Sequence, residues 1–174
     1  MKVLFLIISY IMCLLIVFLN INNLTSSLPI VIKIKENIII EEIKKDLTFL
    51  NAPKEKLDNL ANAIFIANQS TDINYKLIIS LMYTESNFDY TAIGPKNRTK
   101  IRYKGLMQTP TATWFSDVDT LHGARILKNK LKIANNDIKL ALALYKGGNN
   151  NTAKKQAKKV LELYKTLQMQ NEET

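Results

Sequence analysis

The chain has 174 residues, enough for one compact domain and an N-terminal extension. Its one cysteine excludes an internal disulfide, and its one histidine argues against a zinc cluster or a histidine-based catalytic triad. Lysine and arginine outnumber aspartate and glutamate by 24 to 15, and the net charge of +9 favours a polyanionic partner. With one cysteine and one histidine, catalysis would have to use carboxylates, hydroxyls or amides.

The first segment is apolar. Met1 and Lys2 precede a run from Val3 to Leu19, and no further Lys or Arg follows until Lys33. This charge pattern predicts a cytoplasmic N-terminus and an extracytoplasmic remainder. Residues 1–27 are therefore expected to be a signal anchor or a cleaved signal peptide.

Residues 28–51 are predicted to form a stalk or linker, because apolar alternation at Ile30, Ile32 and Ile34 gives way to a charged stretch that suits an amphipathic helix. The compact domain is expected over residues 52–168, with Pro53 as a first helical residue. Residues 169–174 are expected to be a tail.

Every segment of the domain with a clear hydrophobic period has the period of a helix, which predicts an all-α (mainly α) fold. A loop or small hairpin, acting as a flap, is expected from Phe88 to Lys104, and a short helical turn is expected around Trp114. Asn136 is the expected cap of the second-to-last helix, which Gly147 and Gly148 should end. The expected helices cover residues 53–67, 74–86, 120–133, 137–145 and 152–167.

Glu85 is a carboxylate in a position where the pattern demands an apolar side chain. The apolar stripe of its helix runs through Leu77, Ile78, Leu81 and Met82, and its next position is Glu85. Burial disfavours the ionised form of an acid, so the pKa of this carboxyl should be raised. Such a group suits general acid catalysis, although a helix that stopped one turn earlier would leave Glu85 solvated.

Three motifs occur in a defined order. They are Glu85-Ser86-Asn87-Phe88-Asp89, Gly105-Leu106-Met107-Gln108-Thr109-Pro110, and Leu144-Tyr145-Lys146-Gly147-Gly148. Together they resemble the catalytic domain of lytic transglycosylases of the soluble type, which are related to goose-type lysozyme, over roughly Pro53 to Tyr164. The chain departs from the family in having Lys146 where Asn is usual, and Asp119 where an Asn often opens a long helix.

The resemblance implies a lysozyme-like helical domain that cleaves peptidoglycan between N-acetylmuramic acid and N-acetylglucosamine without a cofactor or metal. Glu85 would act first as acid and then as base, and the sugar's own C6 hydroxyl would close a 1,6-anhydro ring. Lys146 could meet a glycan carboxylate or point to solvent. The substrate-binding residues implied are Ser86, Gly105, Met107, Gln108, Tyr145 and Lys146, although Met107 also fits a core position.

Several alternatives stay open. A lysozyme-like hydrolase would use the same acid with water as nucleophile, and a membrane-anchored module would bind glycan without cleaving it. Asp89 is expected to be a loop or capping residue rather than a second catalytic carboxylate. Nucleic acid is the least favoured partner, because the leader predicts an extracytoplasmic location; an envelope-spanning apparatus or a phage is the expected context.

Overall fold

The computed structural model describes residues 31–96, 102–113 and 115–170 and is mainly helical, as expected. Its contacts divide the chain into two compact units, Met1–Ile39 and Ile40–Thr174. Of the first unit, residues 31–39 are described; they are helical, and 31–38 are exposed. No helix within the described residues is long and apolar enough to cross a membrane, and the expected leader over residues 1–27 lies outside them.

The second unit begins at Ile40, earlier than residue 52, where the compact domain was predicted to start. Residues 40–49 are helical, as the amphipathic pattern indicated, but their apolar face is part of the core rather than of a stalk. Ile43 and Leu47 are fully buried, and their spacing of four residues places them on one helical face. The predicted linker over residues 28–51 thus includes a stretch that packs into the domain.

The next elements are a short 3-10 helix, η1 (Lys54–Lys56), and the helices α2 (Leu57–Thr71) and α3 (Tyr75–Ser86). α3 starts where the sequence predicts, because the Asn74 side chain accepts a hydrogen bond from the backbone N–H of Lys76. All residues of α3 from Lys76 to Met82 are buried, so this helix runs through the core.

The expected loop or hairpin between α3 and α4 is an antiparallel hairpin of β1 (Ile93–Lys96) and β2 (Arg102–Lys104), in which Ile93 pairs with Lys104. Its tip, residues 97–101, and Trp114, for which a helical turn was predicted, lie outside the described residues.

The last three helices are α4 (Ser116–Ile133), α5 (Ile138–Tyr145) and α6 (Asn151–Met169). α4 begins one turn earlier than predicted. The cap of α5 is Asp137, whose carboxylate accepts from the backbone N–H of Leu140, so the prediction of Asn136 as the cap was wrong. Gly147 and Gly148 follow α5 with φ of +117° and +114°, which ends the helix as predicted.

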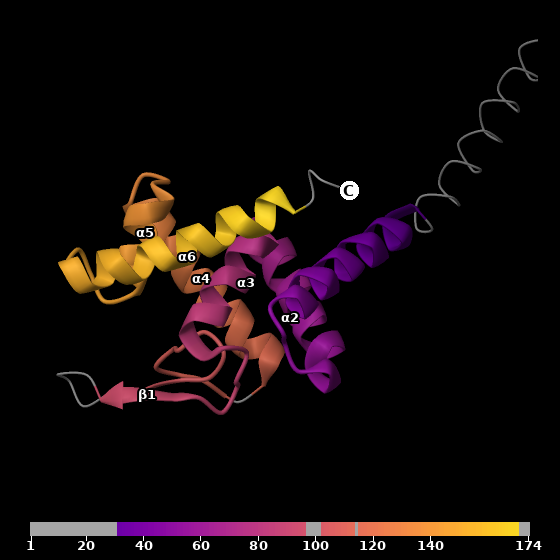
Figure 1. Cartoon of the computed structure of the whole chain (residues 1–174), viewed down its shortest axis with the longest axis horizontal. Helices are drawn as coiled ribbons and strands as arrows, with labels where there is room; N and C mark the ends of the chain where they lie inside the picture. Colours follow the sequence, from indigo (N-terminus) through magenta and orange to yellow (C-terminus); the bar gives the residue numbers. More distant parts are fainter. Residues whose placement is uncertain (1–30, 97–101, 114, 171–174) are drawn as a thin grey trace, which may run out of the picture. The chain divides into compact units, whose positions relative to one another are not determined.

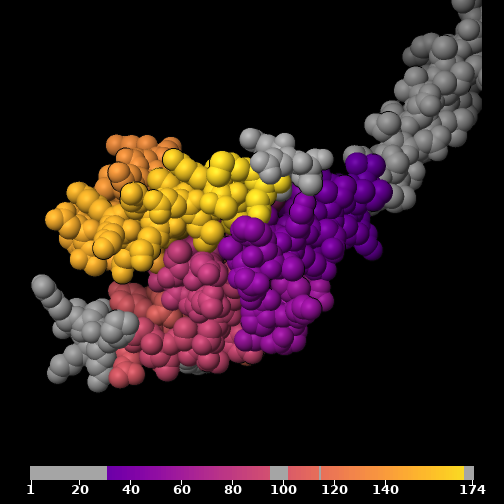
Figure 2. Space-filling model, viewed as in Figure 1, coloured from indigo at the N-terminus to yellow at the C-terminus, as the bar shows by residue number. Residues whose placement is uncertain are grey.

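The core of the second unit is made by helix pairs. α2 packs on α4, α5 packs on both α4 and α6, and α6 also packs on α3 (Figure 1). The space-filling view shows α6 lying directly against the segment that carries α3 (Figure 2). α6 buries Ala153, Ala157, Val160, Tyr164 and Leu167 and turns its lysines to solvent. α3 is therefore held from several sides, which fixes the residues at its end.

One buried polar contact joins distant parts of this core. The Lys76 ammonium donates a hydrogen bond to the carbonyl of Leu167 near the end of α6, and it lies 3.9 Å from a carboxylate oxygen of Asp46. Both side chains are almost completely buried. This pair links residues 40–49, α3 and α6.

Candidate functional site

Glu85 lies in the last turn of α3, at the end of the helix's buried stripe. The helix ends at Ser86, and the chain then reverses through Asn87 and Phe88, which have φ of +52° and +63°. Phe88 is buried and its ring centroid lies 5.5 Å from that of Tyr83, so the reversal is anchored. The Glu85 side chain is consequently only 14% exposed.

The segment Gly105–Thr109 forms a tight loop beside the end of α3. Gly105 has φ of +72°, and a Cβ there would lie 2.5 Å from Oδ2 of Asp119. The loop is braced by Gln108, whose side-chain amide donates to the carbonyls of Ala92 and Gly105 at 3.1 and 3.0 Å. Gly94 leaves the room that the Gln108 side chain occupies. A Cβ at either position would displace a side-chain oxygen, and the positive φ of Gly105 also favours glycine.

Hydrogen bonds to backbone carbonyls connect this loop to α3 and α5. The Ser86 hydroxyl lies 2.9 Å from the carbonyl oxygen of Leu106, and the Tyr145 hydroxyl donates to the carbonyl of Met107 at 2.7 Å. The Met107 side chain is fully buried against Gly123 of α4, so it packs in the core, the alternative left open by the sequence. The three sequence motifs thus meet at one place.

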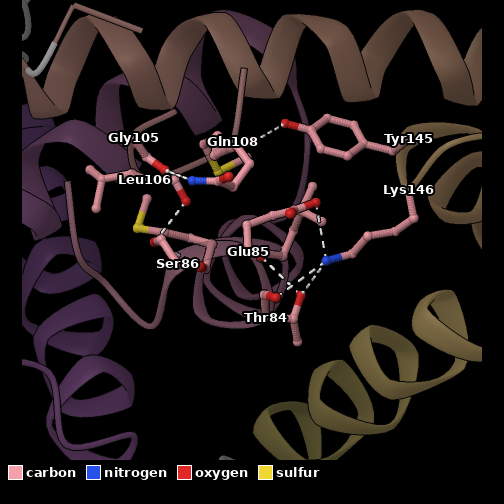
Figure 3. Close-up of polar contacts among 11 residues, drawn as sticks. Thr84, Glu85, Ser86, Gly105, Leu106, Gln108, Tyr145 and Lys146 are labelled. Atoms are coloured by element: carbon pink, nitrogen blue, oxygen red, sulfur yellow. Dashed lines mark hydrogen bonds and ion pairs between the residues drawn. The ribbon is translucent and has the colours of Figure 1, made fainter. Parts of the chain in front are cut away.

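Lys146 faces Glu85 directly. Its ammonium lies 3.0 Å from Oε1 of Glu85, and the two side chains are 7% and 14% exposed. Figure 3 shows the ammonium between the Glu85 carboxylate and Thr84. The Lys146 side chain therefore does not point to solvent, one of the two options raised by the sequence, and its partner is a carboxylate of the chain itself. Sequence reasoning missed this contact, although a buried carboxylate already signals that a cationic partner is needed.

The electrostatics of the pair are governed by burial. Burial raises the pKa of Glu85 above its ordinary value of 4.5, while the charge and hydrogen bond of Lys146 act in the opposite direction. Burial lowers the pKa of Lys146 from 10.5, and Glu85 opposes that decrease. The pKa of Tyr145 is raised well above 10.0, first by burial and then by the negative charge of Glu85. The site therefore holds one carboxyl group whose proton affinity is shifted toward neutral pH.

The other carboxylates considered from the sequence have different roles. Asp89 is exposed, and its Oδ1 accepts from the backbone N–H and the hydroxyl of Thr91 at 2.8 and 2.6 Å. Asp119 lies in the first turn of α4, where its Oδ1 accepts from the backbone N–H of Thr113 at 2.7 Å. Asp89 thus behaves as the loop residue that was predicted, and Asp119 supports the start of α4.

A separate groove of about 620 Å³ lies along η1 and α2, Tyr90 and the start of α4. None of the residues predicted for the site lines it. Phe115 is 68% exposed there, and the Lys56 ammonium lies 4.2 Å from the centre of the Tyr90 ring. Exposed Asn59 and Asn62 add amide groups to this lining. Aromatic faces beside amides suit a ligand that has apolar faces and polar edges.

The described part of the chain contains no group of three or more His, Cys, Asp or Glu side chains placed to hold a metal ion. No family model matches the chain, and comparison with curated proteins finds no match. A function must therefore be argued from the geometry around Glu85.

Proposed function

We propose that the chain is a peptidoglycan lytic transglycosylase with a lysozyme-like helical domain. It would cleave the bond between N-acetylmuramic acid and N-acetylglucosamine and leave a 1,6-anhydro end. The observation that carries the proposal is Glu85, a carboxyl group with a raised pKa that is held at the end of a buried helix. Cleavage of a glycosidic bond requires such a group to protonate the leaving oxygen.

The local hydrogen bonds of the other carboxylates support our choice of the sugar's C6 hydroxyl, rather than water, as the nucleophile. Asp89 and Asp119 are both engaged in local hydrogen bonds, with Thr91 and Thr113 respectively. We therefore assign to neither of them the activation of a water opposite Glu85. A C6 hydroxyl attached to the reacting sugar has a high effective concentration at its own anomeric carbon. Glu85, once it has given up its proton, would accept the proton of that hydroxyl.

The glycan strand would lie over the surface formed by the end of α3, the Gly105–Thr109 loop and the end of α5. Ser86, Gly105, Gln108 and Tyr145 would shape this surface, and Met107 would support it from the core. The side-chain amide of Gln108 and the hydroxyl of Tyr145 already bond to backbone carbonyls, so these residues would hold the loop in shape beneath the strand.

The proposed location is outside the cytoplasmic membrane, reached through residues 1–27 as a signal anchor or signal peptide. The apolar run from Val3 to Leu19 after Lys2 supports this location. Wall opening for an envelope-spanning apparatus or a phage is the proposed context.

Mass analysis of products released from purified cell walls tests the reaction. The wild-type chain should release fragments that end in 1,6-anhydro-N-acetylmuramic acid, and isotope-labelled water should not enter the sugar. A Glu85→Gln chain should release nothing. Label in the product sugar would replace this proposal by the lysozyme-like hydrolase, which shares the same acid.

A second candidate is a glycan-binding module without cleavage activity. It is favoured by the 620 Å³ groove with its exposed Phe115 and by the ion pair that neutralises Glu85. Under this alternative the wild-type chain sediments with purified walls and releases no fragments, and Phe115→Ala weakens sedimentation. Release of anhydro fragments by the wild-type chain and not by Glu85→Gln would reject it.

A further inference from the structure

The Lys146 ammonium is surrounded by three oxygen atoms. Nζ lies 3.0 Å from Oε1 of Glu85, 3.1 Å from Oγ1 of Thr84 and 3.4 Å from the carbonyl oxygen of Thr84. A protonated lysine has three N–H donors and no acceptor, so the number of acceptors around Nζ equals the number of its protons.

These three oxygens can only accept a hydrogen bond from Nζ. The carbonyl of Thr84 has no proton, and the Thr84 hydroxyl donates its own proton to the carbonyl of Leu81 at 3.0 Å. The Glu85 carboxylate has no proton while it is ionised. A neutral amine has a lone pair that would then face an oxygen lone pair, so this arrangement favours the ammonium over the neutral amine.

No other described ionised group competes for this carboxylate. α5 and the residue after it present Tyr145 and Lys146, and the Gly105–Thr109 loop presents the neutral Gln108. α6 turns its lysines to solvent, and on α3 itself Lys76 faces Asp46. The charge of Lys146 is therefore the main electrostatic control on Glu85 besides burial.

We propose that Lys146 is a positioning residue that favours the carboxylate form of Glu85 and thereby shifts its acid chemistry to lower pH than burial alone would set. The inference deepens the proposed function, on which its catalytic part rests. In the resting pair, Nζ holds three protons and Glu85 holds none. Solvent delivers one proton to Glu85, and the contact of Lys146 then becomes a hydrogen bond to a neutral acid. Glu85 passes that proton to the leaving oxygen of the substrate.

Direct titration of the Glu85 side chain tests this inference without any substrate. The full-length chain is labelled with ¹³C at the glutamate carboxyl carbon, and the Glu85 signal is identified by its loss in Glu85→Gln. Lys146→Met and Lys146→Gln both remove the positive charge. Lys146→Gln also keeps a hydrogen-bond donor and serves as the test if Lys146→Met does not fold. An opposite charge within ~4–6 Å lowers a carboxyl pKa by about 1–3 units, so both variants should raise the Glu85 midpoint by about one pH unit or more.

Two control variants make the result specific. Lys155→Met removes the same charge from an exposed position on α6 and should leave the Glu85 midpoint unchanged. Lys146→Arg keeps a cation at the site and should move the midpoint far less than Lys146→Gln does. An unchanged or lowered midpoint in Lys146→Gln would overturn the proposal.

The pH dependence of wall cleavage provides the second readout. The alkaline limb of the pH–rate profile should move to higher pH in Lys146→Gln, because Glu85 then stays protonated up to a higher pH. A limb that moved to lower pH would mean that Lys146 supplies the proton, and the proposal would fail. If the midpoint of Glu85 shifts but no variant cleaves walls at any pH, the proposed function fails while the role of Lys146 toward Glu85 stands.

Discussion

Two buried pairs of a lysine and a carboxylate occur in the same domain, and they are built differently. Lys146 touches Glu85 at 3.0 Å, and all three of its donors have acceptors. Lys76 stays 3.9 Å from Asp46 and gives a hydrogen bond to the Leu167 carbonyl instead, while Oδ2 of Asp46 has no hydrogen-bond partner among the described residues. In our proposal, the first pair sets the charge of one acid. The second fastens three chain segments together.

Glu85→Gln, in the first pair, should have the largest effect on the cleavage of cell walls. A missing general acid lowers the rate of wall cleavage by about 10²- to 10⁴-fold. The Lys146 ammonium also loses its counter-charge, and we expect a loss of about 1–3 kcal/mol in the free energy of unfolding near pH 7, measured by urea denaturation. Glu85→Gln/Lys146→Met should recover part of that stability. Wild-type cleavage by folded Glu85→Gln would remove Glu85 from the reaction.

Lys76→Met should have the opposite profile, with a large effect on stability and none on chemistry. The substitution leaves the Leu167 carbonyl without its donor and a buried Asp46 without a nearby cation. Breaking a buried pair in this way costs about 3–5 kcal/mol, which urea denaturation measures. The cleavage rate of the folded fraction should stay within about twofold of wild type. A selective loss of rate would show that the second pair also serves the site.

Tyr145→Phe tests whether the first pair depends on the loop beside it. The hydroxyl of Tyr145 is the hydrogen-bond donor to the carbonyl of Met107, and phenylalanine leaves that carbonyl unpaired. We expect a loss of about 1–2 kcal/mol in unfolding free energy and a several-fold lower cleavage rate. An unchanged Glu85 midpoint in the titration would separate loop support from the electrostatic role of Lys146.

The pH dependence of the unfolding free energy of Asp46→Asn tests the second pair. Burial raises the pKa of Asp46 above 3.8, and this outweighs the opposing charge of Lys76. When folding raises the pKa of a carboxyl group, the linked stabilisation is complete at pH values below the pKa of the unfolded state. It is lost as pH increases through the pKa of the folded state. Asparagine removes this dependence but leaves the buried Lys76 ammonium without a counter-charge. The difference in unfolding free energy between the variant and wild type should therefore move in the variant's favour as pH rises from 4 to 7. A constant difference across that range would contradict the assignment.

Asp89→Asn should have the smallest effect, because an exposed carboxylate lacks the burial that both pairs share. Its hydrogen bonds with Thr91 lower the pKa of Asp89, so its small contribution is present above pH 3.8 and is lost as pH falls through its folded pKa. We expect wall cleavage within about twofold of wild type and a midpoint in urea that hardly changes. A variant as inactive as Glu85→Gln would favour the hydrolase.

The helices of the domain were largely predictable, because their apolar residues recur with the period of a helix. The Asn74 cap and the end of α5 at Gly147-Gly148 follow from local chemistry that is visible in the sequence. The cap of α5 was misassigned because Asn136 and Asp137 are adjacent residues of similar capping strength. The stretch from Ile40 to Leu50 was assigned to a stalk because its burial depends on partners far along the chain.

The three parts of the candidate site were identifiable from their motifs, but their mutual contacts were not. Periodicity indicated that Glu85 is buried, and the structure adds that its partner is Lys146, sixty-one positions later in the chain. The ion pair also affects the expected stability of Glu85→Gln, because the substitution leaves a buried cation without the partner that the sequence did not reveal. Long-range pairing of charges has no signature in a local hydrophobic pattern.

The direction of α3 has a consequence for the choice of residue at position 146. The backbone dipoles of a helix sum to a partial negative charge at its C-terminus, and Glu85 lies in the last turn of α3. A carboxylate there is repelled by its own helix, whereas a cation that reaches the Thr84 carbonyl is attracted. A neutral donor at position 146 would bond to the same oxygens without offsetting this field. The orientation of one helix thus explains why the neighbour of this acid carries a positive charge.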